Sequence, residues 1–333
     1  MNFDFTEEQA MLRDSVARFV QDDYDFEQRQ RIAASEEGMS RDNWQTFAEL
    51  GWLSIPFAEE HGGFGGSAVD VMLMMEQLGK GLVLEPYLAT VLLFGGLLQK
   101  AGSAEQQAAF IPKVIDGSCL GAFAYLERQS RFELADVKTT AVRNDDGFCL
   151  KGEKVVVFNG ASADHVIVSA RTSGEQADQQ GISLFLVDMS SAGLEKLSYR
   201  MMDGQVVANL VFEDVQVPAA NLVGPLDEAY ALIESAAMEA NVALAAEAVG
   251  IMEQLNTKTV EYTKTREQFG VAIGSFQALQ HRMVDTFMAH EQSKSMLYRA
   301  VCAMTDDKED AVMATHALKV FIDRAGKHVF GEA

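Results

Sequence analysis

The residues best suited to chemistry lie in a short stretch of the last third of the chain. It places Arg266, then Phe269 with Gly270, and then Phe276 with Gln277 between two apolar helical patterns. An arginine guanidinium can bind a phosphate through two hydrogen bonds, and phenylalanine rings offer flat apolar surface to a planar ring such as adenine. The same residues also suit a corner between two helices whose arginine is ion-paired. On the residues alone, both interpretations stay open.

Other familiar catalytic motifs do not occur in the sequence. The glycine-rich run 61–66 lies between two helical patterns, which favours a tight turn over a dinucleotide-binding loop. There is no P-loop, no Gly-x-Ser-x-Gly motif and no His-Glu-x-x-His motif. The six histidines form no ligand cluster, so no metal site is predicted. His281 and His328 are expected on helix surfaces or at an interface.

Composition and charge limit the classes of function. A chain of 333 residues exceeds one hydrophobic core and predicts two or three domains. The net charge of −22 argues against nucleic acid or an anionic membrane as partner. The apolar stretch 87–98 is too short to span a bilayer and is broken by Gly95 and Gly96. No signal peptide is visible, and three scattered cysteines suit a reducing cytoplasm, where we expect the protein.

Residues 1–118 predict an N-terminal α-helical domain. Thr6 with Gln9 forms a capping-box pattern ahead of an apolar helical repeat. Ser103 with Gln106 starts another helix, which is expected to end before Pro112.

Residues 119–224 predict a middle β-domain with antiparallel strands. Pro218 and the Gly224-Pro225 pair mark its end. Its strands are short, rich in β-branched residues and separated by Gly, Ser and Asp; they include 155–158, 166–168, 182–187 and 206–217.

Residues 225–333 predict a C-terminal helical bundle, so the fold class is α+β. Long helical patterns carry apolar stripes at 244–262, 276–287 and 313–321. A bundle this exposed is expected to pack against another subunit. The sequence stops at Ala333 in the middle of a helical pattern, so we expect that the chain continues or that a partner supplies the missing part.

The run TREQFGVAIGSFQALQHRM (265–283) resembles the Arg-x-x-Phe-Gly…Phe-Gln signature of the acyl-CoA dehydrogenase family. The resemblance covers the whole chain, including FTEEQAMLRDSVARFV, PFAEEHGGFGG, LKGEKVVVFNGASADHVIVSAR and LAAEAVGIM. The stretches EEGMSRDNWQTFAELGWL, GLVLEPYLAT and ERQSRFELADV look like the small subunit of pimeloyl-CoA dehydrogenase. Related heteromeric acyl-CoA dehydrogenases act in steroid side-chain degradation.

This resemblance implies an FAD-dependent oxidoreductase. The reaction is α,β-dehydrogenation of an acyl-CoA thioester to a trans-2-enoyl-CoA, in fatty acid or dicarboxylate degradation, with an electron-transfer flavoprotein as electron acceptor. The family assembles as homo- or hetero-oligomers, and a dimer of dimers is expected.

The resemblance also implies the residues that hold FAD. In the family, the Arg-x-x-Phe-Gly segment of one subunit binds the FAD of its neighbour. Arg266 would contact the pyrophosphate, and Gln268, Phe269, Ile273 and Phe276 would line the adenosine half.

The positions that resemble the flavin-ring side depart from the family pattern. Leu126 stands for a threonine, Val156 for a tryptophan and Phe158 for a second threonine; these, with Tyr125, are the weaker cofactor-binding candidates. The loss of each hydroxyl removes a hydrogen bond, an effect of about 1 kcal/mol.

A catalytic base is also missing from the matching position. One branch of the family has a Glu where this chain has Ala240, and Glu239 is no substitute because one residue turns a helix by about 100°. The family's Arg near acyl-CoA is Asn241 here. The other branch carries its base in a later segment, which would lie beyond Ala333.

Two main hypotheses follow. The chain is either a catalytic subunit whose base lies beyond residue 333, or a non-catalytic partner subunit that only completes the FAD site of a larger subunit. The losses favour the second hypothesis, because the part that serves a neighbour is intact. A structural protein with the same fold is the remaining alternative.

Overall fold

The structure, a computed structural model, describes residues 4–306 and 308–333. The chain forms two compact units, each assembled from separate stretches of sequence. The first unit comprises Met1–Arg29, Ser67–Val83 and Asn241–Ala333, and the second comprises Gln30–Gly66 and Leu84–Ala240. The predicted division into three domains at residues 118 and 224 stays a prediction.

The first unit is helical. It contains α1 (Glu7–Asp22), α4 (Ala68–Gly81), most of α7 (Tyr230–Thr265), α8 (Gln277–Asp306) and α9 (Lys308–Glu332). The predicted capping box of α1 is present, with Gln9 N–H donating to the Thr6 hydroxyl at 3.2 Å and Thr6 N–H donating to Gln9 Oε1 at 3.1 Å.

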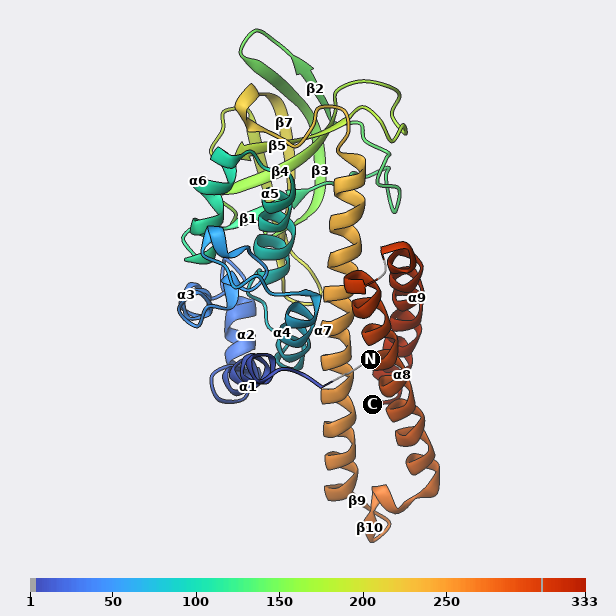
Figure 1. Ribbon diagram of the computed structural model, residues 1–333. Helices are drawn as coiled ribbons and strands as arrows, with labels where there is room; N and C mark the ends of the chain where they lie inside the picture. The colour runs from blue at the N-terminus through green and yellow to red at the C-terminus, as the bar shows by residue number, and fades with distance from the viewer. Residues whose placement is uncertain (1–3, 307) are drawn as a thin grey trace. The chain divides into compact units, whose positions relative to one another are not determined.

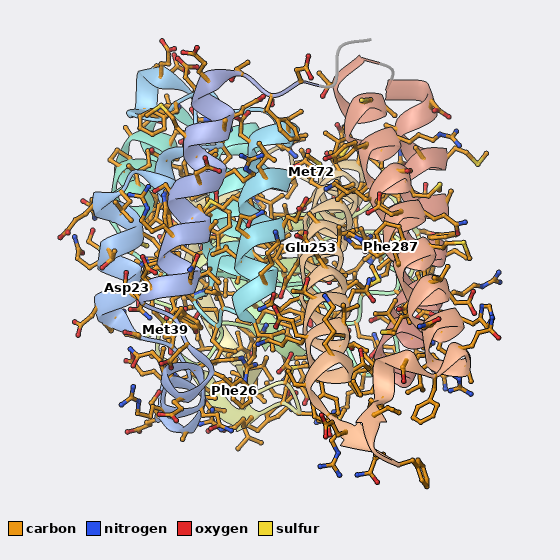
Figure 2. All side chains as sticks on the ribbon, turned by 90° about the horizontal axis from the view of Figure 1, so that it is seen from below. Asp23, Phe26, Met39, Met72, Glu253 and Phe287 are labelled. Carbon is orange, nitrogen blue, oxygen red and sulfur yellow. The ribbon has the colours of Figure 1, made fainter. Side chains whose placement is uncertain are left out.

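Helices α4 and α7 cross at very short range through two glycines. A Cβ added to Gly79 would lie 2.2 Å from the Glu247 carbonyl oxygen, and one added to Gly250 would lie 1.9 Å from that of Glu76. The crossing is held on one side by an ion pair between Lys80 Nζ and Glu253 Oε1 at 3.0 Å; Figure 2 labels Glu253 on α7.

The buried face of α7 differs from the predicted stripe. Leu244 and Tyr262 are exposed, whereas Val242, Ala246 and Val249 are buried. The close crossing explains the difference, because small residues allow two helix backbones to approach and so become the buried ones.

Helices α8 and α9 lie side by side and carry exposed apolar residues (Figure 1). Phe287 on α8, labelled in Figure 2, and Met313 and Val320 on α9 are all exposed in the single chain. Exposed apolar surface of this kind suits a contact with another subunit.

The second unit is built around an eight-stranded sheet (Figure 1). The strand order is β6-β7-β3-β2-β4-β5-β8, with β1 paired to β4. Most neighbours are antiparallel, while β4 pairs in parallel with β1 and, at one register position, with β2. The strands are β1 (Gly121–Ala124), β2 (Thr140–Arg143), β3 (Gly147–Phe158), β4 (His165–Arg171), β5 (Ile182–Asp188), β6 (Leu194–Arg200), β7 (Val206–Pro218) and β8 (Leu222–Val223).

Alternation along the strands makes the core of the sheet. Leu150, Phe185, Leu210 and Phe212 belong to one buried cluster. Their neighbours on β3 and β7 are half-buried or exposed, whereas β5 is buried from 182 to 187. The predicted β-runs therefore fall in β3, β4, β5 and β7, and the α+β fold class is confirmed.

Helical segments complete the second unit. They include α3 (Arg41–Glu49), a π-helix (Tyr87–Gly95), α5 (Gly96–Ala101) and α6 (Ala104–Ile115). The π-helix passes directly into α5 at Gly95 and Gly96. One expectation is wrong here, because helix α6 does not end before Pro112 but includes it and ends at Ile115. Ile111 and Val114, on either side of the proline, are buried, and this packing outweighs the hydrogen bond that the proline cannot make. Among the described residues, no helix is long and apolar enough to cross a membrane.

Candidate functional site

The predicted phosphate-binding segment forms a hairpin corner between α7 and α8 (Figure 1). Strand β9 (Glu267–Gln268) pairs with β10 (Val271–Ala272), and Ile273 N–H donates to the Arg266 carbonyl at 2.8 Å. Phe269 and Gly270 are the two turn residues, with φ of 54° and 79°. A two-residue hairpin turn of this kind needs positive φ at both positions, which explains the glycine and leaves Phe269 at the tip.

The corner presents aromatic and cationic side chains to solvent in the single chain. Phe269 is 93% exposed and Phe276 is 37% exposed, and their rings meet edge to face at 6.3 Å and 82°. Arg266 is exposed, and its guanidinium makes no ion pair within the described part of the chain. The alternative interpretation, an ion-paired arginine at a helix corner, therefore finds no partner there.

Gln268 and Ile273, the other two predicted residues, lie at the same corner as Arg266, Phe269 and Phe276. Gln268 is exposed and donates its side-chain amide to the Glu267 carbonyl at 2.8 Å, and Ile273 is half-buried. The structure thus brings all five predicted residues to one corner. An unpaired guanidinium beside two exposed rings fits the pyrophosphate and adenine of FAD. Contact of this corner with another subunit stays a prediction.

The candidates for the flavin-ring side lie together in the second unit. Leu126 follows β1, and Val156 and Phe158 lie on β3; all three are half-buried. Tyr125 stacks on Phe123 with ring centroids 5.0 Å apart, and burial raises the pKa of its phenol. We call Leu126, Val156 and Phe158 the ring face.

Val156 occupies a bulge with strained backbone. Its φ is 51°, in the left-handed region that β-branched residues rarely adopt. The register with β7 shifts between Lys154 and Val157, and Val156 N–H donates to the Asn209 side-chain oxygen at 3.1 Å. The bulge is therefore stabilised by a side chain of this chain itself.

The ring face does not fit the polar edge of a flavin. The three side chains are aliphatic or aromatic hydrocarbon and offer no hydroxyl or amide where the family pattern has hydroxyls. A flavin edge placed against them would leave its polar atoms without side-chain partners, at a cost for each unmade hydrogen bond. We therefore derive no reaction step at this face.

The position of the missing base holds no replacement carboxylate. Ala240 lies on α7, and the adjacent Glu239 is engaged with Lys100, whose Nζ donates to its carboxylate. The Glu239 carboxylate is held in this ion pair. Its side chain also points about 100° away from that of Ala240, because one residue turns an α-helix by that angle, so Glu239 cannot replace the missing base.

A buried ion pair that the sequence did not reveal joins residues close to the ring face in the chain, Glu127 beside Leu126 and Lys154 two residues before Val156. Lys154 Nζ donates to Glu127 Oε1 at 2.7 Å and to the Ser169 hydroxyl at 2.9 Å, and both charged side chains are buried. Glu127 also accepts the backbone N–H groups of Lys138 at 2.8 Å and Thr139 at 3.1 Å.

These contacts keep the pair ionised at neutral pH. Burial opposes ionisation of Glu127, but the Lys154 ammonium and the hydrogen bonds outweigh it and lower the pKa of Glu127 to about 2. Burial lowers the pKa of Lys154 to about 8, and the negative charge of Glu127, which stabilises the ammonium, offsets only part of this effect. In the sequence, a lysine in the run EKVVVF is easily taken for a solvent-facing strand residue.

Family models cover most of the chain. Models described as acyl-CoA dehydrogenase, N-terminal domain, middle domain and C-terminal domain match residues 6–118, 122–215 and 230–333. A probable acyl-CoA dehydrogenase of Bacillus subtilis, YngJ, is 32% identical over 314 residues, which cover 90% of this chain and 80% of that protein.

Solved structures of similar fold span the whole chain. PigA with FAD and proline has a TM-score of 0.92 at 27% identity, covering 100% of this chain and 88% of that one. The ChsE4–ChsE5 complex from Mycobacterium tuberculosis has a TM-score of 0.89 at 26% identity, covering 100% of this chain and 86% of that one. The predicted fold and family are thus both confirmed, and the matches to 6–118 and 122–215 lie outside the motif that suggested them.

Proposed function

The chain belongs to the acyl-CoA dehydrogenase family, and from this premise we propose that it is the partner half of a heteromeric enzyme. Family membership makes it part of a flavin-dependent oxidoreductase that acts on CH–CH bonds of acyl-CoA thioesters, with FAD as cofactor. When bound, FAD accepts the hydride from the substrate. In our proposal a larger subunit holds the flavin ring and the base, and this chain completes the site from its corner.

One observation carries the proposal: the corner is intact and the ring face is not. Arg266, Phe269 and Phe276 are exposed, and Arg266 makes no ion pair within the described residues. These side chains can therefore bind a ligand held by another subunit. Leu126 and Phe158 lack the hydroxyls that a flavin edge requires. A homomeric enzyme would need both the corner and the ring face intact, because each subunit would bind its own flavin ring and complete the site of its neighbour.

Two further observations support a heteromeric assembly. The exposed apolar residues of α8 and α9, including Phe287 and Met313, suit burial against another helical bundle. The fold also resembles a chain of the ChsE4–ChsE5 complex, which by its name is an assembly of two different proteins. The similarity to the small subunit of pimeloyl-CoA dehydrogenase supports a dicarboxylyl thioester as substrate and an electron-transfer flavoprotein as acceptor.

The flavin content of the purified protein tests this proposal. The chain is expressed alone and together with a larger acyl-CoA dehydrogenase encoded beside it, and the visible spectrum gives FAD per chain. We expect a colourless chain alone and one FAD per pair in the complex. One FAD per chain in the protein expressed alone would show that this subunit is self-sufficient.

The corner is tested separately by Arg266→Ala in the complex. Loss of a charge-assisted hydrogen bond to phosphate should weaken FAD retention by about 10- to 100-fold. Lys264→Ala removes an equal charge from the exposed end of α7 and serves as the matched control. Equal retention in the two variants would mean that Arg266 does not contact the pyrophosphate.

A further inference from the structure

The segment 126–128 is joined to strand β3 by three consecutive contacts. Val155 N–H donates to the Leu126 carbonyl at 2.9 Å. The next residue of each segment forms the buried pair of Glu127 with Lys154 at 2.7 Å, and the next again forms the exposed pair of Arg128 with Glu153 at 2.8 Å. We call these three contacts the clamp.

The outer contact of the clamp has the geometry of a strong surface ion pair. Arg128 Nε lies 3.1 Å and 3.2 Å from the two carboxylate oxygens of Glu153, and its Nη2 lies 2.8 Å from one of them. The pKa of Arg128 is raised, chiefly by this hydrogen bonding to Glu153. An isolated exposed pair contributes little, but a forked guanidinium–carboxylate contact next to a buried pair belongs to the networks that do contribute.

The clamp lies beside the ring face and binds both segments that form it. Leu126 belongs both to the clamp and to the ring face, and Val156 of the ring face directly follows Val155, a clamp residue on β3. In a flavoprotein, hydrogen bonds from the flavin edge would connect two such segments. The side chains of the ring face offer no partner for hydrogen bonds of this kind. The clamp makes that connection from residues of the chain alone.

We propose that Arg128 and Glu153 are positioning residues whose ion pair holds segment 126–131 against β3 in place of a bound flavin. The inference rests on the proposed function in naming the flavin as the group that is replaced. Glu127 also accepts the N–H groups of Lys138 and Thr139, so this end of the segment is held by protein groups without a ligand.

Hydrogen exchange of the full chain, purified without added flavin, tests the clamp. The Val155 amide is the reporter because it donates to Leu126 across the two segments. Arg128→Ala and Glu153→Ala should each speed its exchange by about three- to fivefold, the range that one ion pair of this kind can contribute. The charge-swapped chain, Arg128→Glu with Glu153→Arg, should return to within about twofold of the natural chain.

Matched controls separate the clamp from general loosening. Arg143→Ala removes an exposed arginine from β2 that has no ion pair within the described residues, and it should leave the Val155 amide unchanged. The Phe185 amide, in the core strand β5, should be unchanged in all variants.

Each outcome bears on the proposal. Unchanged exchange in both alanine variants, or fast exchange that persists in the charge-swapped chain, overturns it. Recovery of slow exchange when FAD is added to either alanine variant also overturns it, because the flavin would then organise the face. One FAD per chain, with Val155 exchange that is still faster in the alanine variants and is unchanged by FAD, would refute the partner-half function. The ion pair would then still hold the segment, but beside a bound flavin and not in its place.

Discussion

Replacing Lys154 by methionine tests the largest electrostatic contribution visible in the second unit. The substitution keeps an unbranched side chain, one atom shorter, and removes its charge, so Glu127 stays buried without its cation. Removal of one member of a buried ion pair costs about 3–5 kcal/mol. We therefore expect the free energy of unfolding to fall by about this amount at pH 7.

The two pKa values show how the pair contributes. The pKa of Glu127 is about 2 in the folded chain, against about 4.3 for an unperturbed glutamate, which corresponds to about 3 kcal/mol of stability from the carboxylate at neutral pH. The pKa of Lys154 is lowered to about 8, which costs about as much at the same pH, so the intact pair contributes little net stability and its loss is felt when one partner is removed alone. Because the folded pKa of Glu127 is the lower one, the stability from the carboxylate is present above about pH 4.3 and is lost as the pH falls toward 2.

Urea unfolding followed by circular dichroism measures both effects. We compare the natural chain with Lys154→Met, Glu127→Gln and the double variant at pH 7, and repeat the series between pH 5 and 2.5. The double variant should be less destabilised than the sum of the single ones by about 2–3 kcal/mol, because each single change leaves one buried charge behind and the double change leaves none. The acid-linked loss should be smaller in Glu127→Gln.

A free energy of unfolding of Lys154→Met within about 1 kcal/mol of that of the natural chain would contradict this prediction. Single changes that add without coupling would contradict it equally, since a coupled pair cannot behave additively. Either result would mean that water or another group compensates Glu127.

Three further changes have expected outcomes that follow from local geometry. Gly250→Ala should destabilise the chain by about 2–3 kcal/mol in urea unfolding, because the new Cβ would lie 1.9 Å from the Glu76 carbonyl; Gly326→Ala, whose Cβ would meet nothing within 4 Å, is the control. Arg131→Gly should raise stability by about 1 kcal/mol, because Arg131 has φ of 48°, and an unchanged midpoint would contradict this. Phe269→Ala should leave the chain's stability within about 0.5 kcal/mol while weakening FAD retention by the complex about tenfold, measured by equilibrium dialysis; unaltered retention would remove Phe269 from the site.

Local signals in the sequence predicted most of the helices and strands. The capping boxes at Thr6 and Ser103 start α1 and α6 where expected, because the signal and the structure involve the same four residues. Pro112 misled the prediction, because the burial of Ile111 and Val114 beside it carries α6 through the proline, and packing of this kind is not visible in a local sequence rule. The parallel pairing of β1 with β4 was not predicted either, because pairing between distant strands leaves no local pattern.

The buried face of α7 could not be predicted from apolar periodicity. That method favours large side chains such as Leu244, which is exposed, over the small residues that are buried. Which face is buried depends on Gly79 of α4, more than 150 residues earlier in the chain. A close helix crossing requires small residues on both helices, so the sequence of one helix gives only half of the information needed to predict it.

The two parts of the candidate site differ for the same reason. The corner could be predicted because Arg266 to Phe276 form one hairpin, so that spacing in the sequence is also spacing in the structure. The clamp could not be predicted because Glu127 and Lys154 meet only through pairing of a loop with a strand 27 residues away. Substitutions at the ring face are visible in the sequence as losses, but the contacts that compensate for them are tertiary. A sequence therefore shows more readily which side chains at such a face depart from the family pattern than which tertiary contacts hold the face together.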